Sequence, residues 1–353
     1  SDNLYIADGS GKGRIRKVTK STNLVTTLST AIYARHLAFY GESSLYVAGS
    51  AKIIKIDTST GQETAIGGTG SYCSFNGDNI PATTALIQAE GLAVDKIGNV
   101  YFSDLCLNRI RKIDATTNLV TTIAGNGNAA SSGDNGQASG AEVNDASVLV
   151  FDALDRLYFI ENQIKVRRID LSSGIITTVA TGFSAASSLV VDSDFSIYVG
   201  DGPVIKKIDP AGQITTVAGT GVFGYNGEDK NPLDAQLGYK AGMAIDKAKN
   251  LVISETNGRI RKIANLLGIV LGDIPTFGGV SLYPNPTEDY LQIRGLADVD
   301  AFQLIDVAGR HSTISFERYS EGYRANVKEL PSGVYFLRMS GENMLHHFKF
   351  VKR

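Results

Sequence analysis

The sequence has no tryptophan, two cysteines, four histidines and no long hydrophobic run. Two cysteines are too few for a small disulfide-held domain or for a zinc site built on cysteine. No stretch of about 18 apolar residues is present, so no segment is expected to cross a membrane as a helix. An excess of one charge is also missing, because 34 basic and 36 acidic side chains give a net charge of −2. Such a balance argues against a strongly basic nucleic-acid-binding protein.

Glycine is abundant instead, with 38 of 353 residues, above the usual share of ~7 %. Charged residues make up 20 % of the chain, below the usual ~25 %. The length suits two or three domains, or one large β-domain with a small one. This profile indicates many short strands joined by tight turns rather than a helical bundle.

A tyrosine-containing segment recurs six times along the chain. Its copies align on Tyr5, Tyr46, Tyr101, Tyr158, Tyr198 and Val252, at spacings of 41, 55, 57, 40 and 54 residues. A basic segment such as 109–114 follows each copy, and a Thr/Val segment such as 119–125 comes next in most units. A short apolar segment ending in Asp, such as 91–95, precedes most copies. Four strands per unit at a period of ~40–55 residues are typical of a propeller blade.

The short apolar strand is expected to be innermost, lining the channel. In the basic strand, Ile110 and Ile113 are three residues apart and share a face only if the strand bulges, which the sequence leaves open. Longer spacings contain glycine-rich linkers followed by polar-alanine stretches such as 82–86, which predict one helical turn. Six tyrosine strands accompany five inner strands, so either residues before Ser1 are missing, which we favour, or another segment closes the ring.

Residues 1–268 resemble an NHL-repeat β-propeller, on the evidence of the six units and the linkers of the pattern GTG…GD…PAT. The resemblance implies a binding platform, since most such proteins bind rather than catalyse. Related propellers include zinc-dependent amidating lyases, calcium-dependent lactonases and streptogramin-type lyases. His36 is the only histidine before residue 268, which argues against the zinc site of the first group.

The repeat stops near residue 264, and residues 269–279 form an apolar linker containing glycine and proline. Residues 280–353 show short alternating segments separated by new turns. Alternation with closely spaced turns predicts a small antiparallel β-sandwich of about seven strands, Ig-like in class. The predicted fold is therefore all-β, with a six-bladed propeller followed by this sandwich.

Residues 280–353 resemble the type A C-terminal sorting domain of the type IX secretion system of Bacteroidota. Four motifs occur in the expected order and at the end of the chain. Their residues are Tyr283, Pro284, Asn285 and Pro286; Asp306, Gly309 and Arg310; Ser332, Gly333 and Tyr335; and Lys349, Phe350, Val351 and Lys352. Arg353 after the usual terminal lysine is a small departure.

The resemblance implies a route and partners. The protein would cross the outer membrane through the type IX translocon, escorted by an outer-membrane shuttle protein that recognises residues 280–353. It would then be released into the medium or attached to the cell surface, with the domain usually cleaved. Strand-edge and side-chain contacts would carry the recognition.

Acidic and basic side chains of the repeat suggest two further kinds of site. Six strand-end acids could converge on the channel as a calcium site; they are Asp8, Asp95, Asp104, Asp192, Asp201 and Asp246. The favoured alternative is that each caps its own turn. The basic strands could form a surface for an anionic glycan, although a solvated strand face paired with nearby acids is the favoured interpretation.

Cys73 and Cys106 lie in adjoining units, and an exported protein permits a disulfide between them. No catalytic constellation and no metal site stand out. We therefore predict an exported binding or adhesion module that recognises a surface glycan or protein, not an enzyme and without a nucleic-acid partner. The alternative is a secreted lyase or lactonase with a metal in the channel.

Overall fold

The computed structural model describes residues 3–263 apart from 9–12, 31–33, 50, 72–73 and 229, and C-terminal residues 281–283, 287, 289–294, 301–306, 311–319, 322–341 and 344–352. The chain divides into two compact units, Ser1–Ala264 and Asn265–Arg353. The predicted linker 269–279 lies outside the described residues. The units are called unit 1 and unit 2, and each is treated by itself.

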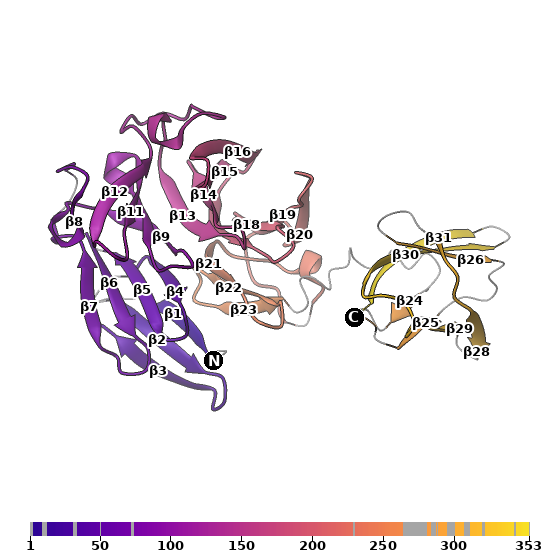
Figure 1. Cartoon of the computed structure of the whole chain (residues 1–353). Helices are drawn as coiled ribbons and strands as arrows, with labels where there is room; N and C mark the ends of the chain where they lie inside the picture. The colour runs from indigo at the N-terminus through magenta and orange to yellow at the C-terminus, as the bar shows by residue number, and fades with distance from the viewer. Residues whose placement is uncertain are drawn as a thin grey trace. The chain divides into compact units, whose positions relative to one another are not determined.

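Unit 1 contains six antiparallel sheets that follow one another in chain order (Figure 1). The first three sheets consist of β1 (Leu4–Asp8), β2 (Arg14–Thr19) and β3 (Leu24–Ser29); β4 (His36–Tyr40), β5 (Ser44–Gly49), β6 (Lys52–Asp57) and β7 (Glu63–Gly67); and β8 (Ile80–Pro81), β9 (Ala89–Val94), β10 (Val100–Asp104), β11 (Arg109–Ile113) and β12 (Leu119–Ala124). The last three consist of β13 (Ala146–Phe151), β14 (Arg156–Glu161), β15 (Lys165–Asp170) and β16 (Ile175–Thr181); β17 (Ala186–Val191), β18 (Ile197–Asp201), β19 (Val204–Ile208) and β20 (Ile214–Ala218); and β21 (Lys240–Ile245), β22 (Leu251–Glu255) and β23 (Ile260–Ile263).

The sheets carry the repeat in the predicted order of inner, tyrosine, basic and Thr/Val strands. Inner strands of neighbouring sheets contact one another in succession, from β4 through β9, β13 and β17 to β21. Apolar clusters then fill the space between sheets; one joins Tyr46 and Ile53 of the second sheet to Leu92 and Phe102 of the third. Radially stacked small sheets with a buried layer between them form a β-propeller. Within the described residues, the first sheet has no inner strand and the last has no fourth strand.

Short 3-10 helices interrupt the linkers and one turn. They are η1 (Ala82–Thr84), η2 (Leu105–Leu107), η3 (Ala138–Gly140) and η4 (Pro232–Asp234). The helical turn predicted for 82–86 is confirmed by η1. None of the helices in the described parts of the chain is long and apolar enough to cross a membrane.

The basic strands bulge, which answers the question that the sequence left open. The register between β11 and β12 shifts at Ile110/Arg111, and Ile110, Arg111 and Ile113 are all buried. Similar shifts recur in the other complete sheets. Because a bulge turns two successive side chains out of strict alternation, an arginine can be buried beside an isoleucine. The bulge therefore prepares the site described below.

Glycine at the start of each long linker is required by close packing. In Gly125, φ is +89° and a Cβ would lie 2.2 Å from the Asn108 carbonyl oxygen. Gly68 and Gly219 repeat this geometry against Ala51 and Pro203, also at 2.2 Å. The glycine excess noted in the composition thus has a steric cause at these turns.

Replacing Gly125 with alanine should lower the free energy of unfolding by about 3 kcal/mol, from the left-handed conformation and the backbone clash together. Gly212→Ala is the matched control, because φ is +84° there but the space around it is open. It should cost only about 1 kcal/mol. Urea unfolding of the full chain checks the pair, and equal losses would contradict the steric argument.

Unit 2 contains two four-stranded antiparallel sheets. One has the order β24 (Ser281–Tyr283), β25 (Tyr290–Arg294), β29 (Gly322–Asn326), β28 (Phe316–Tyr319), and the other β27 (His311–Ser312), β26 (Ala301–Asp306), β30 (Gly333–Gly341), β31 (Met344–Lys352). Leu291 and Ile293 of the first sheet share a buried cluster with Leu304 and Leu337 of the second. Apolar side chains of both sheets therefore form one core.

Candidate functional site

Three long linkers gather at one end of the unit 1 sheets. Residues 67–88, 125–145 and 219–239 each join one sheet to the inner strand of the next, and β10, β14 and β22 end beside them. We call this end the linker face. The turns between the inner and tyrosine strands, such as 95–99 and 152–155, lie at the other end of the strands, which we call the turn face.

An acid at the end of each of these tyrosine strands holds the linker that precedes the inner strand. The acids are buried, and each accepts a hydrogen bond from a linker amide: Gln88 N–H to Asp104 at 3.0 Å, Asn144 N–H to Glu161 at 2.9 Å and Gly238 N–H to Glu255 at 2.9 Å. Burial raises the pKa of the Asp104 carboxyl, and the Gln88 amide and Arg111 oppose that rise. The acids thus fasten the linker ends.

An arginine on the neighbouring basic strand binds the same linkers. Arg111 and Arg167 are at most 1 % exposed, and Arg261 is largely buried. Their guanidinium groups donate to linker carbonyls: Arg111 to Gly77 at 2.6 Å, Arg167 to Ser132 at 2.9 Å and Glu142 at 3.0 Å, and Arg261 to Gln236 at 2.8 Å and Gly227 at 3.3 Å. The expected pairing of the basic strands with nearby acids is confirmed for these residues, but the expected solvated face is wrong because the arginines are buried.

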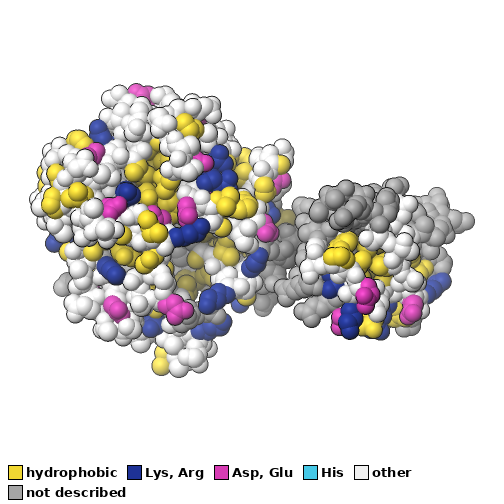
Figure 2. Space-filling model, in the orientation of Figure 1, with side chains coloured by type: hydrophobic (Ala, Val, Ile, Leu, Met, Phe, Trp, Pro, Cys, Tyr) yellow, Lys and Arg dark blue, Asp and Glu magenta, His cyan; other side chains and the backbone are white. Residues whose placement is uncertain are grey.

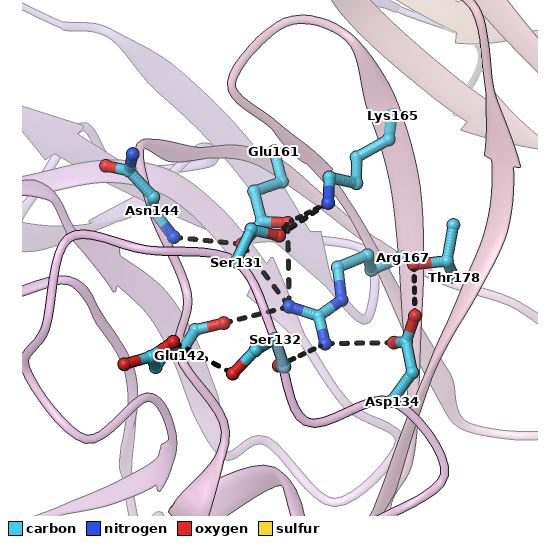
Figure 3. A network of polar contacts seen from close by, with 9 residues as sticks. All are labelled: Ser131, Ser132, Asp134, Glu142, Asn144, Glu161, Lys165, Arg167 and Thr178. Atoms are coloured by element: carbon cyan, nitrogen blue, oxygen red, sulfur yellow. Dashed lines mark hydrogen bonds and ion pairs between the residues drawn. The ribbon is translucent and has the colours of Figure 1, made fainter.

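Arg167 shows the complete arrangement (Figure 3). Its Nη2 lies 2.9 Å from Asp134, which also accepts from the Thr178 hydroxyl, and its Nη1 lies 3.3 Å from Glu161. Lys165 lies 3.4 Å from Glu161 on the open side. The planar guanidinium can serve two carboxylates and two carbonyls at once, which an ammonium group cannot do in one plane.

Comparison of the sheets shows what the arginine is for. In the second sheet the acid and arginine positions are occupied by Gly49 and Ile54, and in the fifth by Asp201 and Lys206. These two sheets follow short connections, whereas the three sheets with a buried arginine follow the long linkers. After a short connection, therefore, the buried arginine is replaced: by Ile54 without an acid in the second sheet, and by Lys206 beside a retained Asp201 in the fifth.

The less favoured alternative, in which the strand-end acids converge on a calcium site in the channel, is wrong. Asp95, Asp192 and Asp246 lie on the turn face, where each accepts amides of its own turn. Asp104 and Asp201 lie at the opposite strand ends and pair with Arg111 and Lys206, and Asp8 pairs with Arg14. Own-turn capping is thus confirmed for Asp95, Asp192 and Asp246, whereas Asp104 and Asp201 accept amides of the preceding connection. Among the described residues, no three His, Cys, Asp or Glu side chains form a group able to hold a metal.

Lys240 is a buried cation that the sequence did not single out. It begins β21, where three other inner strands have alanine, and its Nζ donates to the Gly202 carbonyl at 2.7 Å. Burial lowers the pKa of Lys240 to about 8, although Glu255 and Asp201 act in the opposite direction. Protonation of Lys240 is therefore less favourable in the folded chain than in the unfolded one.

Between pH 8 and 10.5 the unfolded chain retains a proton on Lys240 that the folded chain has lost, so the free energy of unfolding should rise with pH. Lys240→Met should remove this rise, which is on the order of 2–3 kcal/mol. Lys262→Met, at an exposed position of the last sheet, is the control and should keep it. Urea unfolding at a series of pH values checks this; identical slopes for Lys240→Met and wild type would contradict it.

Of the predicted cysteine pair, Cys106 is disulfide-bonded in η2. Cys73 lies outside the described residues, so the pairing of Cys73 with Cys106 stays a prediction. Non-reducing peptide mapping would establish it.

The sorting motifs meet on neighbouring strands of unit 2. Asp306 is the backbone partner of Tyr335, and Gly333 is the partner of Lys352. The buried Tyr335 donates its hydroxyl to Pro331 at 2.9 Å, close to Ser332. Pro284, Asn285, Pro286, Gly309 and Arg310 lie outside the described residues, as do the side chains of Tyr283, Asp306, Lys349, Phe350 and Val351.

The first motif is also tied to the last residues. Thr287, which follows the Tyr283–Pro286 motif, forms a parallel bridge with the buried Lys352. The second, third and fourth motifs thus have residues on the adjacent strands β26, β30 and β31, and the residue after the first motif is bridged to the last of these strands. The structure places them together; their role in recognition stays a prediction.

Aromatic side chains are exposed on the linker face. Phe75, Phe223, Tyr225 and Tyr239 are 40–48 % exposed. Figure 2 shows hydrophobic side chains among acidic and basic ones on the visible face of unit 1. Exposed rings carry a large contact area at a low entropic cost, so they are the groups most suited to binding there.

Comparison with known proteins agrees with both units. Residues 281–353 match the family described as secretion system C-terminal sorting domain. A curated relative, "Protein SUPPRESSOR OF QUENCHING 1, chloroplastic" of Arabidopsis thaliana, is 27 % identical over 179 residues, which is 49 % of this chain and 17 % of that protein. The chain thus spans a small part of this relative's length.

Solved structures resemble unit 1 at low identity. A protein of unknown function from Bacteroides thetaiotaomicron has a TM-score of 0.58 at 21 % identity, and an auxiliary nutrient binding protein from the same species has 0.57 at 17 %. Each comparison covers 74 % of this chain and 66 % of the other. A gluconolactonase from Xanthomonas campestris has 0.53 at 13 %, over 74 % and 82 %. These likenesses show the fold alone.

Fold and motifs together define an exported β-propeller protein. The C-terminal residues belong to the secretion system C-terminal sorting domain family. The chain is a cargo of the type IX secretion system, exported across the outer membrane to the cell surface or the medium.

Proposed function

We propose that unit 1 is a binding or adhesion module that meets its ligand, a surface glycan or protein, on the linker face. In this proposal the six sheets are the blades of an NHL-type propeller, and unit 2 is an Ig-like sandwich read by the translocon and its outer-membrane shuttle protein. The supporting observation is the set of exposed aromatic rings on linkers held by buried ion pairs.

Rigidity of the linkers favours binding. Arg111, Arg167 and Arg261 fix the linker backbones to the sheets, so the rings that the linkers carry lose little conformational freedom when a ligand arrives. A loop held only by solvent would lose more. The likeness to a nutrient binding protein fits this proposal through the fold.

The test compares the two ends of unit 1 in the full chain. Phe75→Ala with Phe223→Ala changes the linker face, and Ile97→Ala with Leu154→Ala is the matched pair on the turn face, where these side chains are 73 % and 62 % exposed. Binding is measured by affinity electrophoresis and biolayer interferometry against neutral polysaccharides, acidic polysaccharides and mucin-type glycoproteins.

The linker-face pair should weaken binding at least tenfold, because each buried ring contributes on the order of 1 kcal/mol, and the turn-face pair should bind like wild type. Retention of no polymer in the panel, or equal binding by both variants, would overturn the proposal. The alternative of a lactonase or lyase with a channel metal has no supporting cluster among the described residues, and lactone hydrolysis by the calcium-loaded full chain would favour it.

A further inference from the structure

The linker before β21 concentrates exposed apolar side chains. Within residues 222–239, five large ones are 40–56 % exposed: Val222, Phe223, Tyr225, Leu233 and Tyr239. Single exposed apolar residues are normal on a soluble protein, but five in one linker make it a candidate interaction site. We call these five residues the 222–239 patch.

The rings of the patch are fixed relative to one another. Phe223 forms a parallel bridge with Leu237, which places its ring 4.4 Å from that of Tyr239, centroid to centroid, at 36°. Below them, Arg261 holds the Gly227 and Gln236 carbonyls. The patch therefore presents two tilted rings on a backbone that is already ordered.

A guanidinium group covers the third ring. Arg259 lies 4.0 Å from the centroid of Tyr225, a cation–π distance, and Arg259 is exposed. The Tyr225 hydroxyl is directed to Glu228, whose bond raises the pKa of the tyrosine. Glu228 also lies 3.9 Å from Arg261, and Glu255 lies 3.9 Å from Arg261 on the buried side. Glu228 and Glu255 thus pair with Arg261 rather than with Arg259.

The equivalent arginine of the third sheet differs in one respect. Arg109 lies 4.4 Å from the centroid of Phe75, but its guanidinium donates to the Leu107 and Asn126 carbonyls at 3.1 and 2.9 Å. Within the described part of the chain, the Arg259 guanidinium donates to no carbonyl and pairs with no carboxylate. Its exposed guanidinium is therefore open to a ligand beside the Tyr225 ring.

We propose that the 222–239 patch binds a polysaccharide containing uronic acids, with sugar faces against Phe223 and Tyr239 and one carboxylate on Arg259. This inference rests on the proposed binding function and names its ligand class. Pyranose rings offer flat C–H faces to aromatic rings, and guanidinium binds carboxylate in bidentate geometry. A protein partner fits less well, since stable protein interfaces take about 20–30 residues a side and this patch has one linker.

The probes are oligosaccharides of galacturonate, alginate and hyaluronan, and the methyl-esterified galacturonate oligosaccharide, which keeps the sugar rings and removes the charge. The full chain should bind at least one acidic probe in calorimetry, and at least tenfold more tightly than its ester. Arg259→Gln should weaken the acidic probe about tenfold and leave the ester unchanged. Lys262→Gln, which removes the same charge from an exposed position of the same sheet, should bind like wild type.

Tyr239→Ala should weaken acidic and esterified probes alike, because stacking does not depend on the carboxylate. Suppose that Tyr239→Ala weakens binding but that acid and ester bind equally, or that Arg259→Gln has no effect. Either outcome would overturn the uronic-acid assignment and leave a binding module for neutral sugar. Absence of binding to all acidic probes would overturn it too, while the wider panel above decides the binding function separately. Binding only to a glycoprotein polypeptide would favour a protein partner instead.

Discussion

Replacing Arg167 with alanine should lower the free energy of unfolding of unit 1 by about 3–5 kcal/mol, the usual cost of removing one partner from a buried ion pair. Glu161 is fully buried and would keep only Lys165 as a nearby cation. The Ser132 carbonyl would lose its guanidinium donor, and the Glu142 carbonyl would keep only the Ser132 amide, at 3.4 Å. The linker 125–145 would therefore be released from the sheet beneath it.

Calorimetry of the full chain measures this loss as a fall in the midpoint of the unit 1 transition of roughly 10 °C. Arg168→Ala is the matched control, since Arg168 is the next residue of β15 and is partly exposed; it should cost about 1 kcal/mol or less. Arg167→Lys should fall between the two, because an ammonium cannot replace the fork of donors. Equal midpoints for Arg167→Ala and Arg168→Ala would refute the role assigned to the buried arginine.

The second sheet explains why both partners must be considered together. Gly49 and Ile54 replace acid and cation there without an unpaired charge, and an apolar pair is often as stable as a buried ion pair. Glu161→Gln in the Arg167→Met background should therefore cost less than in wild type. In the second sheet the apolar pair does not have to hold a long linker. The double variant removes the guanidinium donors that hold the linker 125–145, so this linker should still become accessible to proteolysis.

Deleting residues 281–353 should stop export, leaving the protein in the periplasm of its bacterial host. The matched segment carries all four sorting motifs. Residues of three of them lie on the adjacent strands β26, β30 and β31, and Thr287, next to the remaining one, is bridged to Lys352. Removing the whole unit removes every strand edge that the translocon can read. Fractionation followed by immunoblotting of periplasm, surface and medium measures the effect.

Two controls separate export from stability. The truncated protein must remain protease-resistant in the periplasm, which shows that unit 1 still folds, and full-length Ile97→Ala must reach the medium or the surface. In the reverse experiment, residues 281–353 fused to a periplasmic fluorescent protein should carry it out of the cell. Appearance of the truncated chain outside the cell at the wild-type level would show that another segment directs export.

Much of the fold was predictable because the repeat is visible in the residues themselves. Alternating strands, glycine turns and the 40–57-residue spacing determine where the sheets lie, and these are local properties. The buried arginines were not predicted. A one-residue bulge at Ile110/Arg111 reverses the side of the strand that faces the core, and no simple alternation reveals such a bulge. The available signal was that each of the three sheets after a long linker has an acid at the end of its tyrosine strand and an arginine in its basic strand.

By itself, the sequence determined that this is an all-β, exported protein with a C-terminal sorting domain, because repeats and ordered motifs can be recognised from the order of the residues alone. Tertiary structure decided the rest. It separated the six acids, since strand-end residues one strand apart lie at opposite ends of an antiparallel pair. It also buried Arg111 and Arg167 against the linkers and left Arg259 exposed over Tyr225. Contacts between segments far apart in the chain decide which charged side chains are buried in ion pairs and which remain exposed to a ligand.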